Sequence, residues 1–174
     1  MQHLILGGAR SGKSHYAEQL AEASNKQVIY IATGTAGDDE MQERINKHQS
    51  ERHRYWETIE EPMLIADIIK KYASSNNYLL VDCLTLWLSN ILFDAQGHYQ
   101  EDVFLQQKQA LLDILPDCHT DIALVSNEVG SGVVPMDKMT RRFVDEAGRL
   151  HQQLAKICSH VTLVTAGLPL ALKH

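Results

Sequence analysis

The sequence is poor in the residues that mark disulfide-bonded, zinc-binding and nucleic-acid-binding proteins. Three of its 174 residues are cysteines, Cys83, Cys118 and Cys158, and no two of them stand in C-x-x-C spacing. Neither a disulfide framework nor a zinc site built on cysteine pairs is therefore indicated, and we expect a reducing, cytoplasmic environment. The formal net charge of -6 argues against a general nucleic-acid partner, because contacts with phosphate backbones need a basic surface.

Long apolar runs and linkers are also missing. The longest apolar stretch, residues 78–93, is interrupted by Asp82, Thr85, Ser89 and Asn90, and no basic segment precedes an apolar run at the start. We therefore expect no integral membrane segment and no secretion signal. With 44% hydrophobic residues, no repeat and no Pro/Gly/Ser-rich boundary, the sequence predicts one domain over residues 1–174.

Short apolar runs alternate with helical patterns along the chain, which predicts an α/β fold. The expected strands are residues 3–8, 26–34, 55–61, 77–85, 121–129 and 160–172. The expected helices are residues 13–23, 38–52, 63–75, 103–115 and 136–158, and all four prolines fall outside helix interiors. Such an order favours a mainly parallel sheet covered on both faces, with ligands bound at the carboxyl ends of its strands.

A phosphate-binding loop follows the first strand. In "GGARSGKS" the residues Gly7, Gly12, Lys13 and Ser14 have the spacing G-x-x-x-x-G-K-[ST]. The glycines allow a tight turn whose N–H groups cradle an anion at the start of a helix. Lys13 is expected to reach the β- and γ-phosphates, and the Ser14 hydroxyl to bind Mg²⁺. The sequence therefore predicts a P-loop NTPase fold of three layers.

The second expected magnesium ligand is Asp82, at the end of the most apolar strand. The alternative for this residue is an aspartate that caps a helix or a turn. The loop itself is silent on the phosphate acceptor. A small-molecule kinase, a motor ATPase and a GTPase all stay open, although the guanine-reading N-K-x-D signature is absent.

A row of basic residues lies on the expected helix 38–52. Arg44, His48 and Arg52 are four residues apart and would share one helix face, with a length that suits a triphosphate. Flanking guanidiniums favour a neutral imidazole, which is the form a nucleophile needs. The same pattern is also typical of a plain solvated face. The other eight histidines show no shared metal-ligand spacing.

Two further polar clusters stand at strand ends. Glu60 and Glu61 precede Pro62, and Asn127 and Glu128 precede two glycines. Each cluster is explained equally well by ligand binding and by ordinary turn chemistry.

These segments together resemble one family, the bifunctional adenosylcobinamide kinase and adenosylcobinamide-phosphate guanylyltransferase of cobalamin biosynthesis. The matching stretches are "GGARSGKS", "YIATG", "DDEMQERINKHQSER", "WETIEEP", "LLVDCLT", "NEVGSGVVP", "DEAGRLHQQLA" and "AGLPLALK". They run in order over nearly the whole chain. His151 departs from the family pattern, and the segment between Leu88 and Leu105 matches little.

The resemblance implies two reactions. A nucleoside triphosphate, GTP or ATP, phosphorylates the aminopropanol hydroxyl of adenosylcobinamide. The histidine at position 48 then takes GMP from a second GTP and passes it to adenosylcobinamide phosphate, which gives adenosylcobinamide-GDP. His48 is thus implied as the catalytic residue, with Ser14 and Asp82 as ligands of Mg²⁺.

The resemblance also implies a set of nucleotide contacts and an assembly. The family's members look like trimers, so a homo-oligomer is implied. The implied nucleotide-binding residues are Gly7, Gly8, Ala9, Arg10, Ser11, Gly12, Lys13, Ser14, Thr33, Gly34, Thr35, Gln49, Ser50, Glu51, Glu60 and Asp82.

Two other functions stay open on the residues alone. One is a small-alcohol kinase without guanylyl transfer, in which the row of basic residues only binds phosphates. The other is a non-catalytic nucleotide switch that controls assembly.

Overall fold

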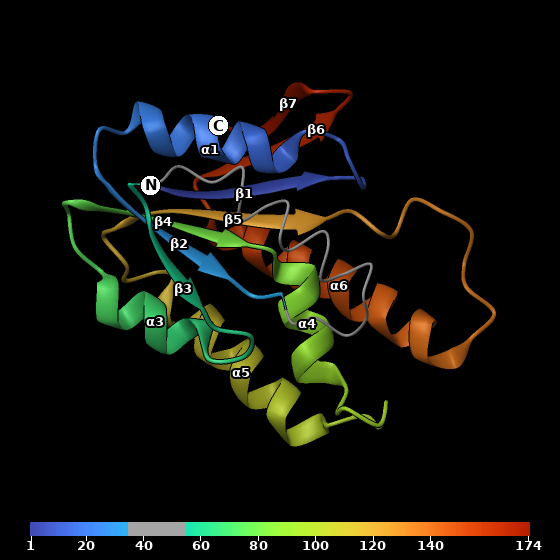
Figure 1. The fold of residues 1–174 in the computed structure, drawn as a ribbon. Coiled ribbons are helices and arrows are strands. Elements are labelled where there is room, and N and C mark those ends of the chain that lie inside the picture. Colours follow the sequence, from blue (N-terminus) through green and yellow to red (C-terminus); the bar gives the residue numbers. More distant parts are fainter. Residues whose placement is uncertain (35–54) are drawn as a thin grey trace.

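A computed structural model describes residues 1–34 and 55–174 of the chain (Figure 1). Its strands form one sheet in the order β3-β2-β4-β5-β1-β6-β7, and all neighbours are parallel except β6 and β7. The strands are β1 (Gln2–Gly7), β2 (Gln27–Ala32), β3 (Glu57–Glu60), β4 (Asn77–Asp82), β5 (Asp121–Asn127), β6 (His160–Thr165) and β7 (Leu168–Lys173).

Helices cover both faces of the sheet. They are α1 (Lys13–Ala23), α3 (Ile65–Tyr72), α4 (Leu84–Leu92), α5 (Glu101–Ile114) and α6 (Lys138–Ile157). Among the described elements, α1 packs alone on one face and the other four helices pack on the opposite face (Figure 1). These three layers confirm the predicted P-loop NTPase fold, with β5 lying between the strand of the phosphate loop and the strand that ends in Asp82.

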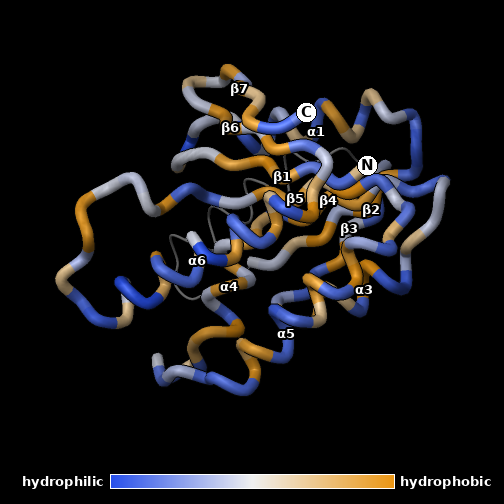
Figure 2. The backbone as a smooth tube through the Cα atoms, turned by 180° about the vertical axis from the view of Figure 1, so that it is seen from behind, coloured by the Kyte–Doolittle hydropathy of each residue, from blue (hydrophilic) through white to orange (hydrophobic). Residues whose placement is uncertain are grey.

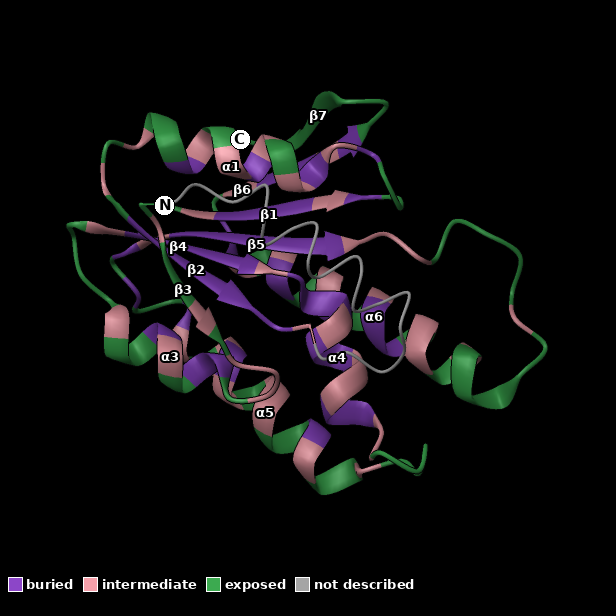
Figure 3. Cartoon of the chain, viewed as in Figure 1, coloured by how far each residue is buried: buried purple, intermediate pink, exposed green. Residues whose placement is uncertain are grey.

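The central strands are buried from both sides. Residues of β4 alternate between two clusters, since Leu79 and Val81 pack toward α3 and α4 while Tyr78 and Leu80 pack toward α1. Figure 3 shows the inner strands as buried along most of their length, and Figure 2 shows hydrophobic residues concentrated in the sheet and the inner helix faces. Because both faces are covered, these strands read in the sequence as continuous apolar runs.

Two expected elements in the described part of the chain differ from the structure, and the helix expected over residues 38–52 lies outside that part. The strand expected over residues 77–85 ends at Asp82, and the next residues form helix α4, which the sequence reasoning missed. This helix is buried on most sides, with Leu84, Trp87 and Leu88 inaccessible, so its apolar positions show no helical period.

The strand expected over residues 160–172 is a hairpin of two strands, β6 and β7. The chain reverses at Ala166 and Gly167, which both have positive φ. Ala-Gly is a weak turn signal beside Asn-Gly or Asp-Gly, and so the sequence did not mark the reversal.

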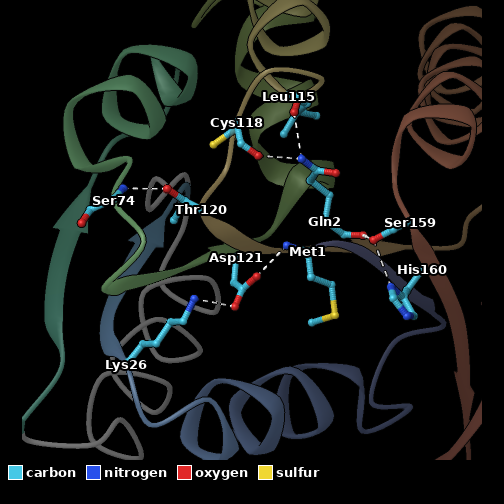
Figure 4. A network of polar contacts seen from close by, with 10 residues as sticks. All are labelled: Met1, Gln2, Lys26, Ser74, Leu115, Cys118, Thr120, Asp121, Ser159 and His160. Atoms are coloured by element: carbon cyan, nitrogen blue, oxygen red, sulfur yellow. Dashed lines mark hydrogen bonds and ion pairs between the residues drawn. The ribbon is translucent and has the colours of Figure 1, made fainter.

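The amino edge of the sheet is tied together by polar contacts (Figure 4). Asp121, the first residue of β5, accepts from the amino group of Met1 at 2.6 Å and forms an ion pair with Lys26 at 2.8 Å. Gln2 donates its side-chain amide to the carbonyls of Leu115 and Cys118. These contacts lie at the opposite end of the strands from the phosphate loop. Within residues 1–34 and 55–174, none of the helices has the length and apolar character needed to span a bilayer.

Candidate active site

The phosphate loop lies at the carboxyl edge of the sheet, between the end of β1 and the start of α1. The structure brings together the loop residues predicted from the sequence, which are Gly7, Gly8, Ala9, Arg10, Ser11, Gly12, Lys13 and Ser14. Gly12 precedes the first residue of α1 with φ of 93°, and Arg10 has φ of 56°. Left-handed residues in a loop turn the backbone N–H groups toward one side, which is the geometry of an anion-binding nest.

Lys13 lies against its own loop. Its side chain is buried, and Nζ donates to the carbonyl of Gly8 at 3.2 Å. Its charge also reaches the end of β4: burial and the Asp82 charge raise the pKa of the Cys83 thiol, and the Lys13 ammonium acts against them. The loop lysine follows the end of β1 and Asp82 ends β4, so both lie at the carboxyl edge of the same sheet.

Asp82 ends β4 on the face covered by α1. It does not cap α4, because Cys83 is the N-cap residue of that helix and makes no side-chain capping bond. Instead, the Asp82 Oδ2 atom accepts a hydrogen bond from the Tyr30 hydroxyl at 2.7 Å. Tyr30 lies in β2 on the same face. This contact orients one carboxylate oxygen of Asp82.

Glu60 stands at the same level of the sheet as Asp82. In the strand register, Ala32 of β2 is opposite Glu60 of β3 on one side and opposite Asp82 of β4 on the other. Residues directly opposite each other in neighbouring strands point to the same face, so both carboxylates lie on the α1 face. Thr33 and Gly34 continue β2 beyond this level.

Thr33 forms hydrogen bonds with the residues at the end of β4. Its hydroxyl donates to the Cys83 carbonyl at 2.6 Å and accepts from the Cys83 N–H at 2.9 Å, and its own N–H donates to the Asp82 carbonyl at 3.2 Å. The side chain is fully buried. Thr33 therefore joins the ends of β2 and β4 and fixes where Asp82 stands.

Two glutamates that follow strand ends, Glu61 and Glu128, accept hydrogen bonds from backbone N–H groups of the turns in which they lie. Glu61 Oε1 accepts from the N–H groups of Met63 and Leu64 at the start of α3. Glu128 accepts from the N–H groups of Gly130 and Ser131. Burial opposes ionisation of Glu128, but these hydrogen bonds outweigh it and hold its pKa below the ordinary value. Turn chemistry thus explains both side chains.

Asn127 ends β5 directly beside the phosphate loop. It is opposite Gly7 in the register and continues the side of β5 that faces α1. Its Oδ1 atom is buried and has no hydrogen-bond partner. On the other face, Ser126 Oγ lies 2.7 Å from Nε2 of His151 in α6, and burial lowers the pKa of this histidine against the opposing effect of Glu128.

Five residues expected in the site lie outside the described part of the chain, namely Thr35, His48, Gln49, Ser50 and Glu51. The two arginines expected beside His48, Arg44 and Arg52, lie outside it as well.

Sequence reasoning missed two contacts that shape the site. The bond from Tyr30 to Asp82 joins residues 52 positions apart, and the β6–β7 turn touches the phosphate loop. Both depend on strand order, and no local sequence pattern carries that information.

The residues that would hold Mg²⁺ fit that ion. Ser14 lies in the first turn of α1, and Asp82 lies on the α1 face with one oxygen bound by Tyr30. Within the described ranges no three His, Cys, Asp or Glu side chains gather as a metal cluster. Mg²⁺ beside a nucleotide needs no such cluster, since one or two protein ligands and the phosphates complete its coordination.

Comparisons with solved structures show the fold. A protein from Pyrococcus horikoshii OT3 aligns with 99% of this chain and 85% of its own, with a TM-score of 0.52 and 8% identity. A prototypical ATPase from the type III secretion system of pathogenic bacteria aligns with 94% of this chain and 52% of its own, with a TM-score of 0.50 and 12% identity.

Comparisons of sequence are more specific. The bifunctional adenosylcobalamin biosynthesis protein CobP of Pseudomonas aeruginosa is 49% identical over 173 residues, which cover 99% of this chain and 98% of that protein. The bifunctional adenosylcobalamin biosynthesis protein CobU of Escherichia coli is 38% identical over 182 aligned positions, which cover 99% of this chain and all of that protein. A model of the family described as cobinamide kinase / cobinamide phosphate guanyltransferase matches residues 3–172. The chain belongs to this family.

Proposed function

We propose that the chain catalyses both reactions of its family. It phosphorylates adenosylcobinamide with a nucleoside triphosphate and then transfers GMP from GTP to the phosphorylated product. The observation that carries the proposal is the position of the phosphate loop, with Lys13, and of Asp82 at the same carboxyl edge of the sheet, in a chain that matches the family model over residues 3–172.

The first reaction is a direct phosphoryl transfer. The acceptor hydroxyl oxygen attacks the γ-phosphorus, the bond from that phosphorus to the β-phosphate oxygen breaks, the nucleoside diphosphate leaves, and the hydroxyl proton passes to water. The N–H groups of the loop and Lys13 bind the phosphates and offset the charge that builds on their oxygens. Mg²⁺ held by Ser14 and Asp82 would supply further charge neutralisation.

The second reaction proceeds through His48. Its imidazole attacks the α-phosphorus of GTP, the bond to the β-phosphate breaks, and pyrophosphate leaves. A phosphate oxygen of adenosylcobinamide phosphate then attacks the same phosphorus and the P–N bond breaks. A phosphoramidate suits this exchange because it is both formed and displaced readily.

The test uses GTP labelled at the α-phosphorus. The unchanged chain is expected to acquire an acid-labile, alkali-stable label, and His48→Ala to acquire none. His53→Ala, which removes a histidine from the same segment, is the control and should label normally. With γ-labelled GTP, His48→Ala should still phosphorylate adenosylcobinamide, whereas Lys13→Ala should fail in both assays.

Two results would contradict the proposal. Label retained by His48→Ala would remove its role as the GMP carrier. Transfer of γ-phosphate by the unchanged chain without any covalent GMP would leave a small-molecule kinase.

We also propose that the chain forms a trimer in the cytoplasm, as the family resemblance implies. Free, buried cysteines at positions 83, 118 and 158 suit a reducing compartment. Association would cover the apolar side chains exposed on the edge strand β7, which are Leu168, Leu170 and Leu172. Sedimentation equilibrium measures the mass of the assembly, and a monomer at micromolar concentration would contradict a trimer.

A further inference from the structure

The turn between β6 and β7 touches the phosphate loop from the side opposite β5. Its residues Ala166 and Gly167 have φ of 53° and 77°. The Gly167 N–H donates to the Ser11 carbonyl at 2.8 Å. A Cβ atom on Gly12 would lie 3.1 Å from the Gly167 Cα, so the backbones of turn and loop are in direct contact.

This hydrogen bond fixes the orientation of one peptide unit in the loop. In a trans peptide, the carbonyl of Ser11 and the N–H of Gly12 point in opposite directions. Since the turn holds the Ser11 carbonyl, the Gly12 N–H is directed away from the turn. An anion-binding nest depends on N–H groups held in such fixed directions.

Other loop carbonyls are held in the same manner by different partners. The Gly7 carbonyl accepts from the Glu128 N–H at 3.0 Å, at the end of β5. The Gly8 carbonyl accepts from the Ser11 N–H and from Lys13 Nζ, each at 3.2 Å. The loop is thus held by β5 on one side, by its own residues in the middle, and by the β6–β7 turn on the other side.

We propose that Gly167 is a positioning residue for the nucleotide phosphates. It acts through the peptide unit of Ser11 and Gly12, whose orientation it fixes. The inference rests on the proposed function, in which the same loop serves both transfers. Weakening the contact is therefore expected to reduce GTP affinity in the kinase and the guanylyltransferase reactions alike.

The test changes residue 167 without creating a collision. A Cβ atom there would meet no atom within 4 Å, so the backbone conformation is the main property that a substitution changes. A β-branched residue is strongly disfavoured at positive φ, whereas asparagine tolerates it. Gly167→Val should therefore distort the turn, Gly167→Ala should distort it less, and Gly167→Asn should preserve it.

The matched control is Gly97, which lies in the turn between α4 and α5, on the other face of the sheet. Its φ is 81°, and a Cβ there would come no closer than 3.9 Å to another residue, at the Met139 sulfur. Gly97→Val thus introduces the same backbone strain at a position without contact to the phosphate loop.

The measurements are GTP binding by calorimetry in a His48→Ala background, where no GMP is transferred to the chain, and the steady-state constants of both reactions with His48 present, on variants whose folding is checked by circular dichroism. Gly167→Val is expected to raise the Kd for GTP about fivefold, the effect of one lost hydrogen bond. KM for GTP should rise in both reactions while kcat changes less, since binding rather than chemistry is weakened. Gly167→Asn and Gly97→Val should stay within about twofold of the unchanged chain.

Equal GTP affinity in Gly167→Val, Gly167→Ala and the unchanged chain would overturn the inference, as would equal weakening by Gly97→Val. If Gly167→Val does not fold, the comparison of Gly167→Ala with Gly167→Asn decides. Absence of GTP binding by the unchanged chain would instead contradict the proposed function.

Discussion

Tyr30 shows how one side chain outside the phosphate loop shapes the site. Its hydroxyl donates to Asp82 Oδ2 at 2.7 Å, and its ring is buried on the α1 face of the sheet. Removing a group that orients a metal ligand typically lowers metal affinity by about 10- to 100-fold. Tyr30 therefore belongs to the machinery that would hold Mg²⁺.

We expect Tyr30→Phe to raise the Mg²⁺ concentration that gives half-maximal kinase activity about tenfold, because the Asp82 carboxylate loses its oriented partner. The matched control is Tyr78→Phe. Tyr78 lies in β4 on the same face, and its buried hydroxyl has no hydrogen-bond partner, so its removal should leave the magnesium dependence unchanged. A titration of activity with MgCl₂ at fixed GTP measures both, and identical curves for Tyr30→Phe and the unchanged chain would contradict the assignment.

At the scale of single residues, the sequence predicts which residues form a motif better than it predicts the contacts that their side chains make. The spacing of Gly12, Lys13 and Ser14 predicts a loop that the structure contains. The alternatives for the strand-end glutamates could be decided only in the structure, where Glu61 and Glu128 serve turns. Hydrogen bonds of such short side chains depend on backbone N–H positions that composition does not specify.

At the scale of elements, α4 joins segments that the sequence separates. Trp87 is fully buried, and its Nε1 donates to the Met63 carbonyl at 2.8 Å. Asn90 donates to the carbonyls of Thr33 at 2.9 Å and Pro62 at 3.1 Å. This helix therefore holds the end of β2 and the segment that follows β3, next to the predicted nucleotide contacts Thr33 and Gly34.

Short apolar strands and helices with one polar side could be predicted from the sequence, whereas a helix buried on most sides could not. Helix α1 begins and ends where its pattern predicts, at Lys13 and Ala23. Helix α4 lacks a polar face, and the turn at Gly167 lacks a strong signal, so both were missed. Burial on all sides removes the periodicity on which such predictions depend.

Asn90→Ala should lower the free energy of unfolding by about 2 kcal/mol, because two partly buried carbonyls lose their donors. It should also raise KM for GTP, since Thr33 and Gly34 lose their support. Ser89→Ala, a half-buried neighbour on the same helix, is the control and should change stability by less than about 0.5 kcal/mol. Urea unfolding with GTP kinetics measures both effects, and a stability loss shared equally by the two variants would contradict this role of Asn90.

At the scale of the whole molecule, the two edges of the sheet have different roles. The carboxyl edge carries the phosphate loop and Asp82, and the amino edge carries the ion pairs of Asp121 (Figure 4). His3 lies near this amino edge in β1. Its ring is buried, with Nε2 2.8 Å from the Thr162 hydroxyl and no partner for Nδ1. Burial and, less strongly, His160 lower its pKa to about 4.

Because His3 lies near the amino edge of the sheet, we expect acid to lower the stability of the fold at a place away from the nucleotide site. The unfolded chain protonates His3 below pH 6.5, whereas the folded chain resists until about pH 4, so stability is complete above pH 6.5 and is lost as the pH falls toward 4. The loss should approach about 3 kcal/mol. Partial burial opposes ionisation of Asp121, but hydrogen bonds and charges from Lys26 and the amino terminus lower its pKa overall, so its protonation costs stability only below the ordinary aspartate value. Urea unfolding between pH 4 and pH 8 should show a flatter curve for His3→Gln, with the loss due to His151, whose pKa burial also lowers, still present. His15→Gln, at an exposed position of α1, should follow the unchanged chain. An equally steep curve for His3→Gln would place the acid sensitivity elsewhere, whereas a flatter one would make β1 an element through which acid weakens the sheet.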